Sequence, residues 1–312
     1  MRYLVTGATG LVGSHLVDRL LSQGSAVRVL VRRTVDADAF RARGAEARLG
    51  DLADADAVPA AVDGVDVVVH SAGVVQVRGQ HRDLWAVNVD GTERLLAASV
   101  QAGLGRFVHI STVAVYAHTG APMPEDAPKR PAGAYGKSKW AAEEALWRRH
   151  ADQGLPAVAL RPCVVYGGRD RHAWPTLSRL AKMRFVPLPA GGARLFDLVH
   201  VSDVVDAIVA AAVAPAAAGR AYNVTDGESH SYRDILTALG RLVHRPPAIV
   251  AVPSFAWRLA ARLVPAARAL DLDLHYPIDA AGRDLGYRPR VGLAEGLERT
   301  FREMRDPATG ST

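Results

Sequence analysis

The segment Tyr135-Gly136-Lys137-Ser138-Lys139 places a phenol and a primary amine four residues apart. On a helix, residues at this spacing share a face, so the Lys139 ammonium can approach the Tyr135 phenol. A free tyrosine has a pKa of about 10, and a neighbouring cation favours the phenolate and lowers that pKa. Tyr135 is therefore a candidate acid–base that takes a proton from a substrate hydroxyl or returns it to a carbonyl oxygen. The alternative is a pair of surface residues.

Two polar side chains upstream are candidates to assist this chemistry. Thr112 follows the apolar run Phe107 to Ser111, and a hydroxyl at the carboxyl end of a parallel strand faces the crevice where such sheets bind ligands. It can steady the reacting oxygen. Asn88 lies within an expected helix, where its amide either organises a water near Lys139 or bends the helix. The predicted catalytic residues are Asn88, Thr112, Tyr135 and Lys139.

Three glycines follow the first apolar run at G-x-x-G-x-x-G spacing. Glycine permits a tight turn and a close approach of the backbone to a pyrophosphate, which the N–H groups of a helix N-terminus bind. The position between an expected strand and an expected helix favours a dinucleotide site over an ordinary glycine-rich turn. The residues expected to contact the cofactor here are Gly7, Thr9, Gly10, Leu11, Val12 and Gly13.

The end of the second expected strand bears on the choice of cofactor. An NAD site offers an acidic side chain to the ribose 2′-hydroxyl about 20 residues after the glycines, whereas an arginine there receives the 2′-phosphate of NADP. Arg32 and Arg33 occupy this place, so the sequence favours NADP(H), with NAD(H) as the second choice. The alternative is that both arginines are solvated surface charges. Asp51, followed by Leu52, either accepts a hydrogen bond from the adenine amine or caps a helix.

These residues require a scaffold in which strands and helices alternate. Apolar, β-branched runs predict strands at Tyr3 to Thr6, Ala26 to Val31, Val65 to His70, Phe107 to Ser111 and Ala157 to Arg161. Helical patterns are found at Leu11 to Ser22, Asp54 to Ala61, Asp83 to Ala102 and Tyr135 to Gln153. Continuous apolar runs are typical of strands covered on both faces. The alternation predicts an α/β fold with a doubly wound parallel sheet, a Rossmann fold.

Beyond about Tyr166 this alternation breaks and prolines become more frequent. A strand is expected at Leu195 to His200, and helices at Ser202 to Ala212, Tyr232 to Val243, Ser254 to Leu263 and Leu293 to Met304. We therefore expect a dinucleotide-binding domain with the catalytic residues at 1–165. A smaller C-terminal α/β lobe at 166–306 is expected mainly to bind substrate, with segments that return to the sheet, and 307–312 form a frayed tail.

Composition narrows the class of protein. With 312 residues, 49% of them hydrophobic, the chain can bury a substantial core. The net charge is +6, and the basic residues, almost all arginines, are scattered along the sequence among acidic ones. This distribution argues against a nucleic-acid partner. A single cysteine, Cys163, excludes an internal disulfide and a Cys-rich metal site, and we predict no metal. No apolar run is long enough to span a bilayer. A cytoplasmic location is expected, with loose membrane association left open.

Together these residues resemble the extended short-chain dehydrogenase/reductase family over nearly the whole chain. The resemblance rests on Thr6 to Gly13, Asp51-Leu52, Asn88 to Thr92, Ser111 to Tyr116 and Tyr135 to Lys139, in family order. It implies that Thr112, Tyr135 and Lys139 are catalytic and that Asn88 supports them. It also implies that Tyr135 and Lys139 contact the cofactor, with Lys139 hydrogen-bonding the nicotinamide ribose.

The same resemblance implies further contacts and an assembly. Ala72 and Gly73 match the turn beside the cofactor, and Pro162 matches the proline near the nicotinamide. A homodimer through the long helices expected at 83–102 and 135–153 is also implied.

Three later segments resemble the 3β-hydroxysteroid and sterol dehydrogenase branch, with dihydroflavonol reductases nearby. They are Arg161 to Asp170, Val199 to Val204 and Tyr222 to Glu228. Sugar-nucleotide epimerases usually carry an asparagine shortly after the Arg161 position, and 162–165 contain none. Arg32 departs from the acid that steroid dehydrogenases of this branch often carry. The apolar segment Pro253 to Val264 either lines a pocket or packs the lobe.

These features predict an NAD(P)-dependent alcohol/ketone oxidoreductase that acts on a bulky, largely apolar hydroxy or keto small molecule, with Tyr135 as acid–base. A second reading is a sugar-nucleotide epimerase or dehydratase that uses bound NAD. A third is a non-enzymatic nucleotide sensor, against which the intact Tyr135 and Lys139 argue.

Overall fold

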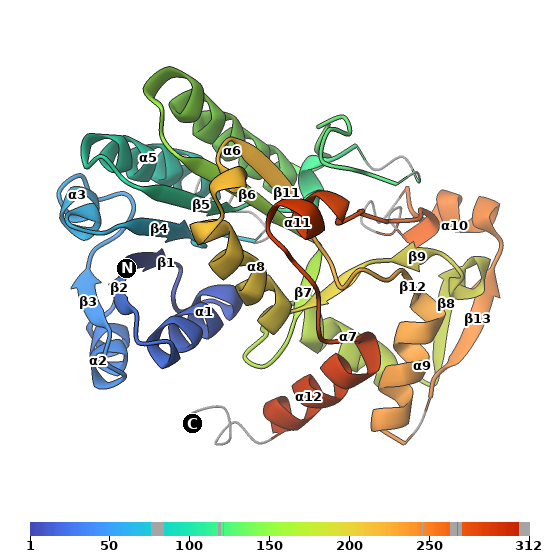
Figure 1. Ribbon diagram of the computed structural model, residues 1–312. Helices are drawn as coiled ribbons and strands as arrows, with labels where there is room; N and C mark the ends of the chain where they lie inside the picture. Colours follow the sequence, from blue (N-terminus) through green and yellow to red (C-terminus); the bar gives the residue numbers. More distant parts are fainter. Residues whose placement is uncertain are drawn as a thin grey trace.

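The main body of the protein is a seven-stranded sheet with helices on both faces (Figure 1). The computed structural model describes residues 1–75, 84–117, 120, 122–244, 246–262, 267 and 270–305. The strands run in the order β11-β6-β5-β4-β1-β2-β3, and every neighbouring pair is parallel. They are β1 (Arg2–Thr6), β2 (Ala26–Val31), β3 (Glu46–Leu49), β4 (Val67–His70), β5 (Arg106–Ile110), β6 (Ala157–Pro162) and β11 (Arg220–Val224). The predicted doubly wound parallel sheet is confirmed.

Two helical layers cover this sheet. Helices α1 (Leu11–Ser22), α2 (Thr34–Ala42) and α8 (Val201–Val213) pack on one face. Helices α3 (Ala57–Val62), α5 (Gly91–Gln101) and α6 (Ala134–Gln153) pack on the other. In β4, Val67 and Val69 join the first layer and Val68 joins the second, because successive strand side chains point to opposite faces. Both faces are buried, which explains why these strands read as continuous apolar runs.

The order of the strands fixes where a ligand can bind. Strand β1 lies between β2 and β4, and Thr6 at its end pairs with Leu30 on one side and His70 on the other. The chain therefore winds outward in opposite directions from β1. In open α/β sheets, ligands bind in the crevice outside the carboxyl ends of the strands at such a switch point.

One helix begins later than the sequence predicted, and another contains an unexpected turn. Helix α3 starts at Ala57 instead of Asp54, because the Asp54 carboxylate accepts the Asp56 and Ala57 backbone N–H groups at 2.9 and 3.1 Å and holds a turn there. The helix expected at 83–102 is described from residue 84 and contains a π-helical turn, Ala86–Asp90, before α5. Asp83 lies outside the described residues.

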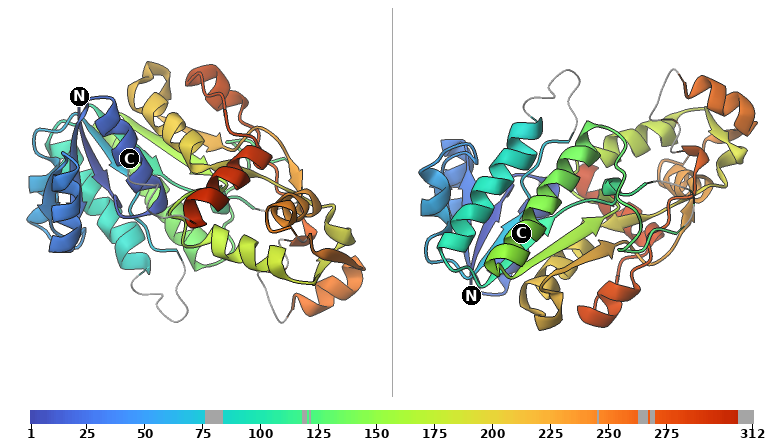
Figure 2. Two further views of the ribbon diagram at one scale, coloured as in Figure 1. Left: turned by 90° about the horizontal axis from the view of Figure 1, so that it is seen from below. Right: turned by 90° about the horizontal axis from the view of Figure 1, so that it is seen from above.

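The rest of the chain forms a smaller lobe at one end of the sheet, visible in Figures 1 and 2. Its strands are β7 (Val164–Tyr166), β8 (Phe185–Pro189), β9 (Leu195–Phe196), β10 (Leu198–His200), β12 (His230–Ser231) and β13 (Ala248–Val252). They pair as β10-β7, β12-β9 and β13-β8. Its helices are α7 (Ala173–Lys182), α9 (Tyr232–Leu242), α10 (Ser254–Ala260), α11 (Asp279–Asp284) and α12 (Leu293–Arg305). Strand β11 returns to the main sheet beside β6.

In the second half of the chain, sequence patterns located three helices and missed helix α7 and most of the short strands. Helices α8, α9 and α12 lie within one or two residues of their predicted bounds. The strand expected at 195–200 is two strands, because Asp197 turns its carboxylate to the Tyr276 backbone N–H at 2.8 Å. Leu263 and the tail 307–312 lie outside the described residues. No described helix combines the length and hydropathy needed to cross a membrane.

Candidate active site

The glycine loop after β1 is held against the loop after β4 by close backbone packing. Gly7 has a positive φ of 70°, and a Cβ on it would lie 2.5 Å from the Ala72 nitrogen. A Cβ on Gly13 would overlap the Gly7 carbonyl oxygen. Both positions therefore require glycine. Gly10 is the N-cap of α1 and has no side chain to accept the N–H groups of the first turn, so these donors remain available to an anion.

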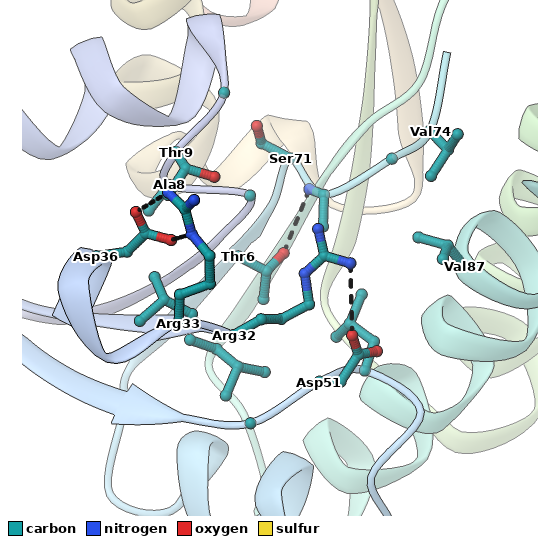
Figure 3. Close-up of a pocket in the computed structure, with 18 of the residues that line it drawn as sticks. Thr6, Ala8, Thr9, Arg32, Arg33, Asp36, Asp51, Ser71, Val74 and Val87 are labelled. Carbon is teal, nitrogen blue, oxygen red and sulfur yellow. Dashed lines mark hydrogen bonds and ion pairs between the residues drawn. The ribbon is translucent and has the colours of Figure 1, made fainter. Parts of the chain in front are cut away.

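A cavity of about 660 Å³ opens at this helix N-terminus (Figure 3). The loops after β1, β2, β3 and β4 form its wall, which agrees with a ligand site at the switch point. Its lining residues are Thr6 to Gly10, Leu30 to Arg33, Asp36, Gly50 to Leu52, Ser71 to Val74, Val87 and Arg171. An extended cavity that meets free backbone donors at a helix N-terminus fits the pyrophosphate and adenosine part of a dinucleotide.

Nine of the residues predicted to bind cofactor line this cavity. They are Gly7, Thr9, Gly10, Arg32, Arg33, Asp51, Leu52, Ala72 and Gly73. Among the described residues, Leu11, Val12, Gly13, Tyr135, Lys139 and Pro162 are not part of the lining. Leu11 to Gly13 form the first turn of α1, and Pro162 ends β6. Sequence reasoning missed Asp36 and Arg171. No local pattern marks Arg171, because it comes from the small lobe.

The two arginines after β2 differ in how tightly acids hold them (Figure 3). Arg33 donates to both carboxylate oxygens of Asp36 at 2.7 and 2.8 Å, and this contact lowers the pKa of Asp36. Arg32 is 76% exposed and lies 3.7 Å from Asp51. Asp51 also accepts the Ala53 N–H, whereas Asp54 holds the turn before α3. Arg32 is therefore paired more loosely than Arg33. Asp51 does not cap helix α3, which corrects the helix-cap alternative.

Helix α6 carries Tyr135 and Lys139, and Thr112 lies just after the carboxyl end of β5. Tyr135 is half-buried in its first turn, and its phenol interacts with the Thr112 side chain. Burial raises the pKa of Tyr135, and the Thr112 bond opposes that shift. This direction is opposite to the one expected from the Lys139 cation. The Lys139 ammonium instead donates to the Ile110 carbonyl oxygen at 2.7 Å. The phenol therefore holds its proton at neutral pH.

Lys139 is buried, with 4% of its surface exposed. Burial lowers the pKa of Lys139 to about 8, while the nearby Glu143 carboxylate acts in the opposite direction. A group with this pKa is mostly ammonium at pH 7 and loses its charge above pH 8.

Asn88 joins the lip of the cavity to the catalytic helix. Its side-chain oxygen accepts the Val74 N–H at 2.8 Å, and its amide nitrogen donates to the Val74 carbonyl at 3.1 Å and to the Ser138 hydroxyl at 3.0 Å. Ser138 in turn donates to the Tyr135 carbonyl at 2.8 Å. Asn88 lies in the π-helical turn and uses its whole amide to tie the loop after β4 to α6. It supports the site by position.

A buried histidine links the same turn to the glycine loop. In the His70 ring, Nδ1 lies 2.7 Å from the Thr6 hydroxyl oxygen and Nε2 lies 2.8 Å from the Thr92 hydroxyl oxygen. Thr92 donates its own proton to the Asn88 carbonyl, so Nε2 carries the ring proton and Nδ1 accepts from Thr6. Burial, with a further contribution from Lys139, lowers the pKa of His70 to about 3. The imidazole is therefore neutral.

Behind the catalytic residues lies a buried ion pair that the sequence did not indicate. Glu143, one turn after Lys139 on α6, is fully buried and pairs with Arg161 of β6. It also accepts the Ser111 hydroxyl at 2.7 Å. Arg161 donates to the Tyr116 hydroxyl at 2.8 Å, and Tyr116 donates to Asn223 of β11 at 2.7 Å. This network fixes α6 against the ends of three strands.

Together these elements provide a nucleotide cavity and, joined to its lip through Asn88, a protonated phenol beside a hydroxyl and a lysine. This arrangement can transfer a proton to or from an oxygen atom at the mouth of a dinucleotide site. Within the described ranges, no group of three or more His, Cys, Asp or Glu side chains is placed to hold a metal ion.

Comparisons with known proteins agree with this geometry. The model of the NAD dependent epimerase/dehydratase family matches residues 3–225. A Stigmatella aurantiaca 4-hydroxy-2-methyl-3-oxo-4-farnesyl-3,4-dihydroquinoline-1-oxide ketoreductase is 32% identical over 96% of this chain and 95% of its own. A Mycobacterium tuberculosis 3 beta-hydroxysteroid dehydrogenase/Delta 5-->4-isomerase is 32% identical over 95% of this chain and 88% of its own. The solved structure of MoeE5 with UDP-glucose and NAD superposes with a TM-score of 0.81 at 30% identity, covering 99% of this chain and 100% of that one.

Proposed function

The chain belongs to the NAD-dependent epimerase/dehydratase family and is an enzyme of the extended short-chain dehydrogenase type, and from that premise we propose that it interconverts a ketone and an alcohol on a bulky, largely apolar small molecule. The observation that carries the proposal is the contact between Tyr135 and Thr112, one helical turn from Lys139. The Asn88 amide connects these residues to the cofactor cavity.

Proton transfer follows from the positions and pKa values of these side chains. The glycine loop and the cavity beside it would hold the dinucleotide, whose reduced nicotinamide would be the source of hydride for the carbonyl carbon. Tyr135, whose pKa is raised by burial, donates the proton to the carbonyl oxygen as the alcohol forms. Thr112 donates a hydrogen bond to the same oxygen. The phenolate then recovers a proton from solvent, while the Lys139 ammonium, held on the Ile110 carbonyl, keeps a positive charge one helical turn away. In the reverse direction the same residues accept the proton of the alcohol.

Two observations support an apolar substrate. The Stigmatella relative is named for a farnesylated ketone and the Mycobacterium relative for a steroid. The segment that follows Arg161 has apolar side chains, in which Cys163 is buried and Val164 and Val165 are half-buried. It presents no side-chain amide for the diphosphate of a sugar nucleotide.

A sugar-nucleotide epimerase is the second candidate, because MoeE5, at 30% identity, was solved with UDP-glucose and NAD. The two functions differ in redox balance. We would follow NADPH absorbance with a panel of apolar ketones, including a β-keto ester and a 3-ketosteroid, and in parallel assay UDP-glucose for its C4 epimer. Steady NADPH consumption with a ketone supports the reductase. Epimer formation without NADPH consumption, with NAD trapped in the purified protein, supports the epimerase and rejects our proposal.

The cofactor is proposed to be NADP(H) in preference to NAD(H). Arg32 is exposed, is only loosely paired with Asp51 and lines the cavity where the adenosine ribose is expected. It can therefore receive a 2′-phosphate. Relatives solved with NAD show that the family fold also accepts the unphosphorylated nucleotide. Calorimetric titration with NADPH and NADH tests the preference, and equal or weaker NADPH binding rejects it.

The proposal extends to organisation and location. Residues 1–165 are proposed to bind the cofactor and carry the catalytic side chains, and 166–306 to contribute most substrate contacts. Helices α5 and α6 lie side by side on one face (Figure 1) and are proposed to form a homodimer interface, with the protein in the cytoplasm. Light scattering on the wild type and Arg148→Glu tests the dimer, because Arg148 is an exposed residue of α6. A wild-type monomer rejects it.

A further inference from the structure

The basic residues of this chain are unevenly distributed, which corrects the expectation that they are scattered among acids. Residues 171–196 and 235–270 contain no aspartate or glutamate. They contain ten basic residues: Arg171, Arg179, Lys182, Arg184, Arg194, Arg241, Arg245, Arg258, Arg262 and Arg268. Since the whole chain has 38 basic and 32 acidic residues, the remainder holds 28 basic residues against all 32 acids. The positive net charge is therefore carried by these two segments.

The fold brings the middle parts of the two segments together at the far end of the small lobe, whereas Arg171 lies at the cofactor cavity. Strand β8 of the first pairs in parallel with β13 of the second, and α10 follows β13 and packs against β8. Figures 1 and 2 show these elements at the end of the molecule opposite β2 and β3, where the cofactor cavity lies. We name this region, Lys182 to Phe185 with Val250 and Phe255 to Arg262, the distal surface.

The β8–β13 pair has one covered face and one face with exposed apolar side chains. On the covered side, Val186 and Leu188 pack against Leu236 of α9. On the other side, Phe185 is 52% exposed and Val250 is 46% exposed. Large apolar side chains in water are unfavourable, and a contiguous group of them marks an interaction site.

Helix α10 adds a second apolar ridge. Phe255 and Leu259, four residues apart on one helical face, are 76% and 62% exposed. Trp257, by contrast, is held against the protein, because its indole N–H donates to the Ala267 carbonyl at 2.8 Å. Arg258 and Arg262 are also exposed and lie on the same helical end. This short helix therefore presents two apolar side chains outward with arginines beside them.

The cations of the distal surface are available to an external partner. Among the described residues, no carboxylate lies within 4 Å of Lys182, Arg184 or Arg262, whereas Arg258 lies 3.5 Å from Asp271. The Arg184 guanidinium lies over the Phe185 ring at 5.1 Å, which keeps the charge next to the apolar face. Apolar side chains among basic ones match the boundary between acyl chains and anionic headgroups.

We propose that the distal surface docks on a bilayer that contains anionic phospholipid. Phe185, Phe255 and Leu259 enter the headgroup boundary, and the surrounding arginines and Lys182 contact the lipid phosphates. Two copies of this positive surface would repel each other, which disfavours self-association through it. A nucleic acid would leave the apolar side chains uncovered. Docking at this end leaves the cofactor cavity, at the opposite end, open to water. The inference does not depend on which substrate is used.

Flotation of the full chain with vesicles tests the proposal. We expect binding to vesicles of phosphatidylglycerol and phosphatidylcholine in equal parts, weaker binding to phosphatidylcholine alone, and release at high salt. The double variant Phe255→Ser/Leu259→Ser should lower the partition coefficient by at least about ten-fold, because it removes two largely exposed apolar anchors. Reversal of one charge, Lys182→Glu, should lower it by at least about five-fold.

Matched controls separate docking from general effects on the protein. Val213→Ser replaces a 53% exposed valine on α8, and Arg302→Glu reverses a 70% exposed arginine on α12. Both should bind vesicles like the wild type, and all variants should retain NADPH binding as a sign of folding. Equal vesicle binding by the wild type and the Phe255/Leu259 variant overturns the proposal. Absence of wild-type binding to anionic vesicles also overturns the proposal. This holds even if the protein self-associates or binds an acidic protein through this surface.

Discussion

Replacement of Glu143 with glutamine removes the charge of a carboxylate that is completely buried behind the catalytic residues. Glu143 pairs with Arg161, whose side chain is 3% exposed, and accepts the Ser111 hydroxyl and the Trp147 indole N–H. In Glu143→Gln the Arg161 guanidinium keeps its bonds to Tyr116 and the Glu125 carbonyl, but its positive charge has no buried partner. An uncompensated buried charge destabilises a fold much more than loss of a surface pair.

The magnitude follows from burial and chain length. Breaking a buried ion pair on one side costs about 3 to 5 kcal/mol of the free energy of unfolding. With an unfolding entropy of about 2.1 cal/mol/K per residue over 312 residues, this lowers Tm by about 5 to 8 °C. The variant should also lower the pKa of Lys139, because Glu143 is the group that raises it. The alkaline limb of the pH–activity profile should therefore move to lower pH.

Thermal unfolding by calorimetry and a pH–rate profile measure the two effects. Glu144→Gln is the matched control, since Glu144 is the next residue and is exposed; its Tm and pH profile should equal those of the wild type. The double variant Glu143→Leu/Arg161→Met, which removes both charges, should be more stable than Glu143→Leu. A Tm for Glu143→Gln equal to that of the wild type would refute the reasoning.

Three other predictions concern charge at the site. Because the pKa of Lys139 is lowered to about 8, kcat/KM for ketone reduction should fall above pH 8, and Lys139→Arg should move that fall to higher pH; a profile flat to pH 10 would contradict this. The pKa of His70 is lowered to about 3, so protons bind the unfolded chain more tightly and stability falls as pH drops below about 6.5, by about 1.4 kcal/mol per pH unit. Urea unfolding at several pH values checks this slope, which His70→Asn should reduce. Arg32→Asp should weaken NADPH by at least about ten-fold and NADH little in calorimetry, with Arg41→Asp as an exposed control; equal losses would remove Arg32 from the 2′-phosphate role.

Sequence reasoning located the parts of the site that depend on neighbours in the chain. The glycine spacing sets a turn before α1, and the Tyr135 to Lys139 spacing sets one helical face. Both are short-range patterns, and the α1 bounds, Leu11–Ser22, were predicted to the residue. The parallel strands were predictable because burial on both faces leaves continuous apolar runs.

The remaining features depend on contacts between distant residues. Arg161 hydrogen-bonds Glu143, 18 residues away in the sequence, and Tyr116, 45 residues away. Tyr116 hydrogen-bonds Asn223, 107 residues away. No local pattern shows which polar residues a fold will bury together. The direction of the pKa shift of Tyr135 was mispredicted for the same reason. The spacing between Tyr135 and Lys139 does not reveal that the Lys139 ammonium donates to the Ile110 carbonyl. The short strands of the small lobe, such as β8 and β13, have two to five residues and gain their structure from pairing.

The central claim is that Tyr135 transfers the proton in a ketone–alcohol interconversion, and Tyr135→Phe tests it most directly. We would measure kcat with NADPH and the best ketone, together with the NADPH dissociation constant by calorimetry. The account predicts a fall in kcat of about 100- to 10,000-fold, the typical contribution of a general acid. NADPH affinity should stay within a factor of about three, because Tyr135 does not line the cavity proposed to hold most of the nucleotide. A variant that turns over at the wild-type rate would contradict the account.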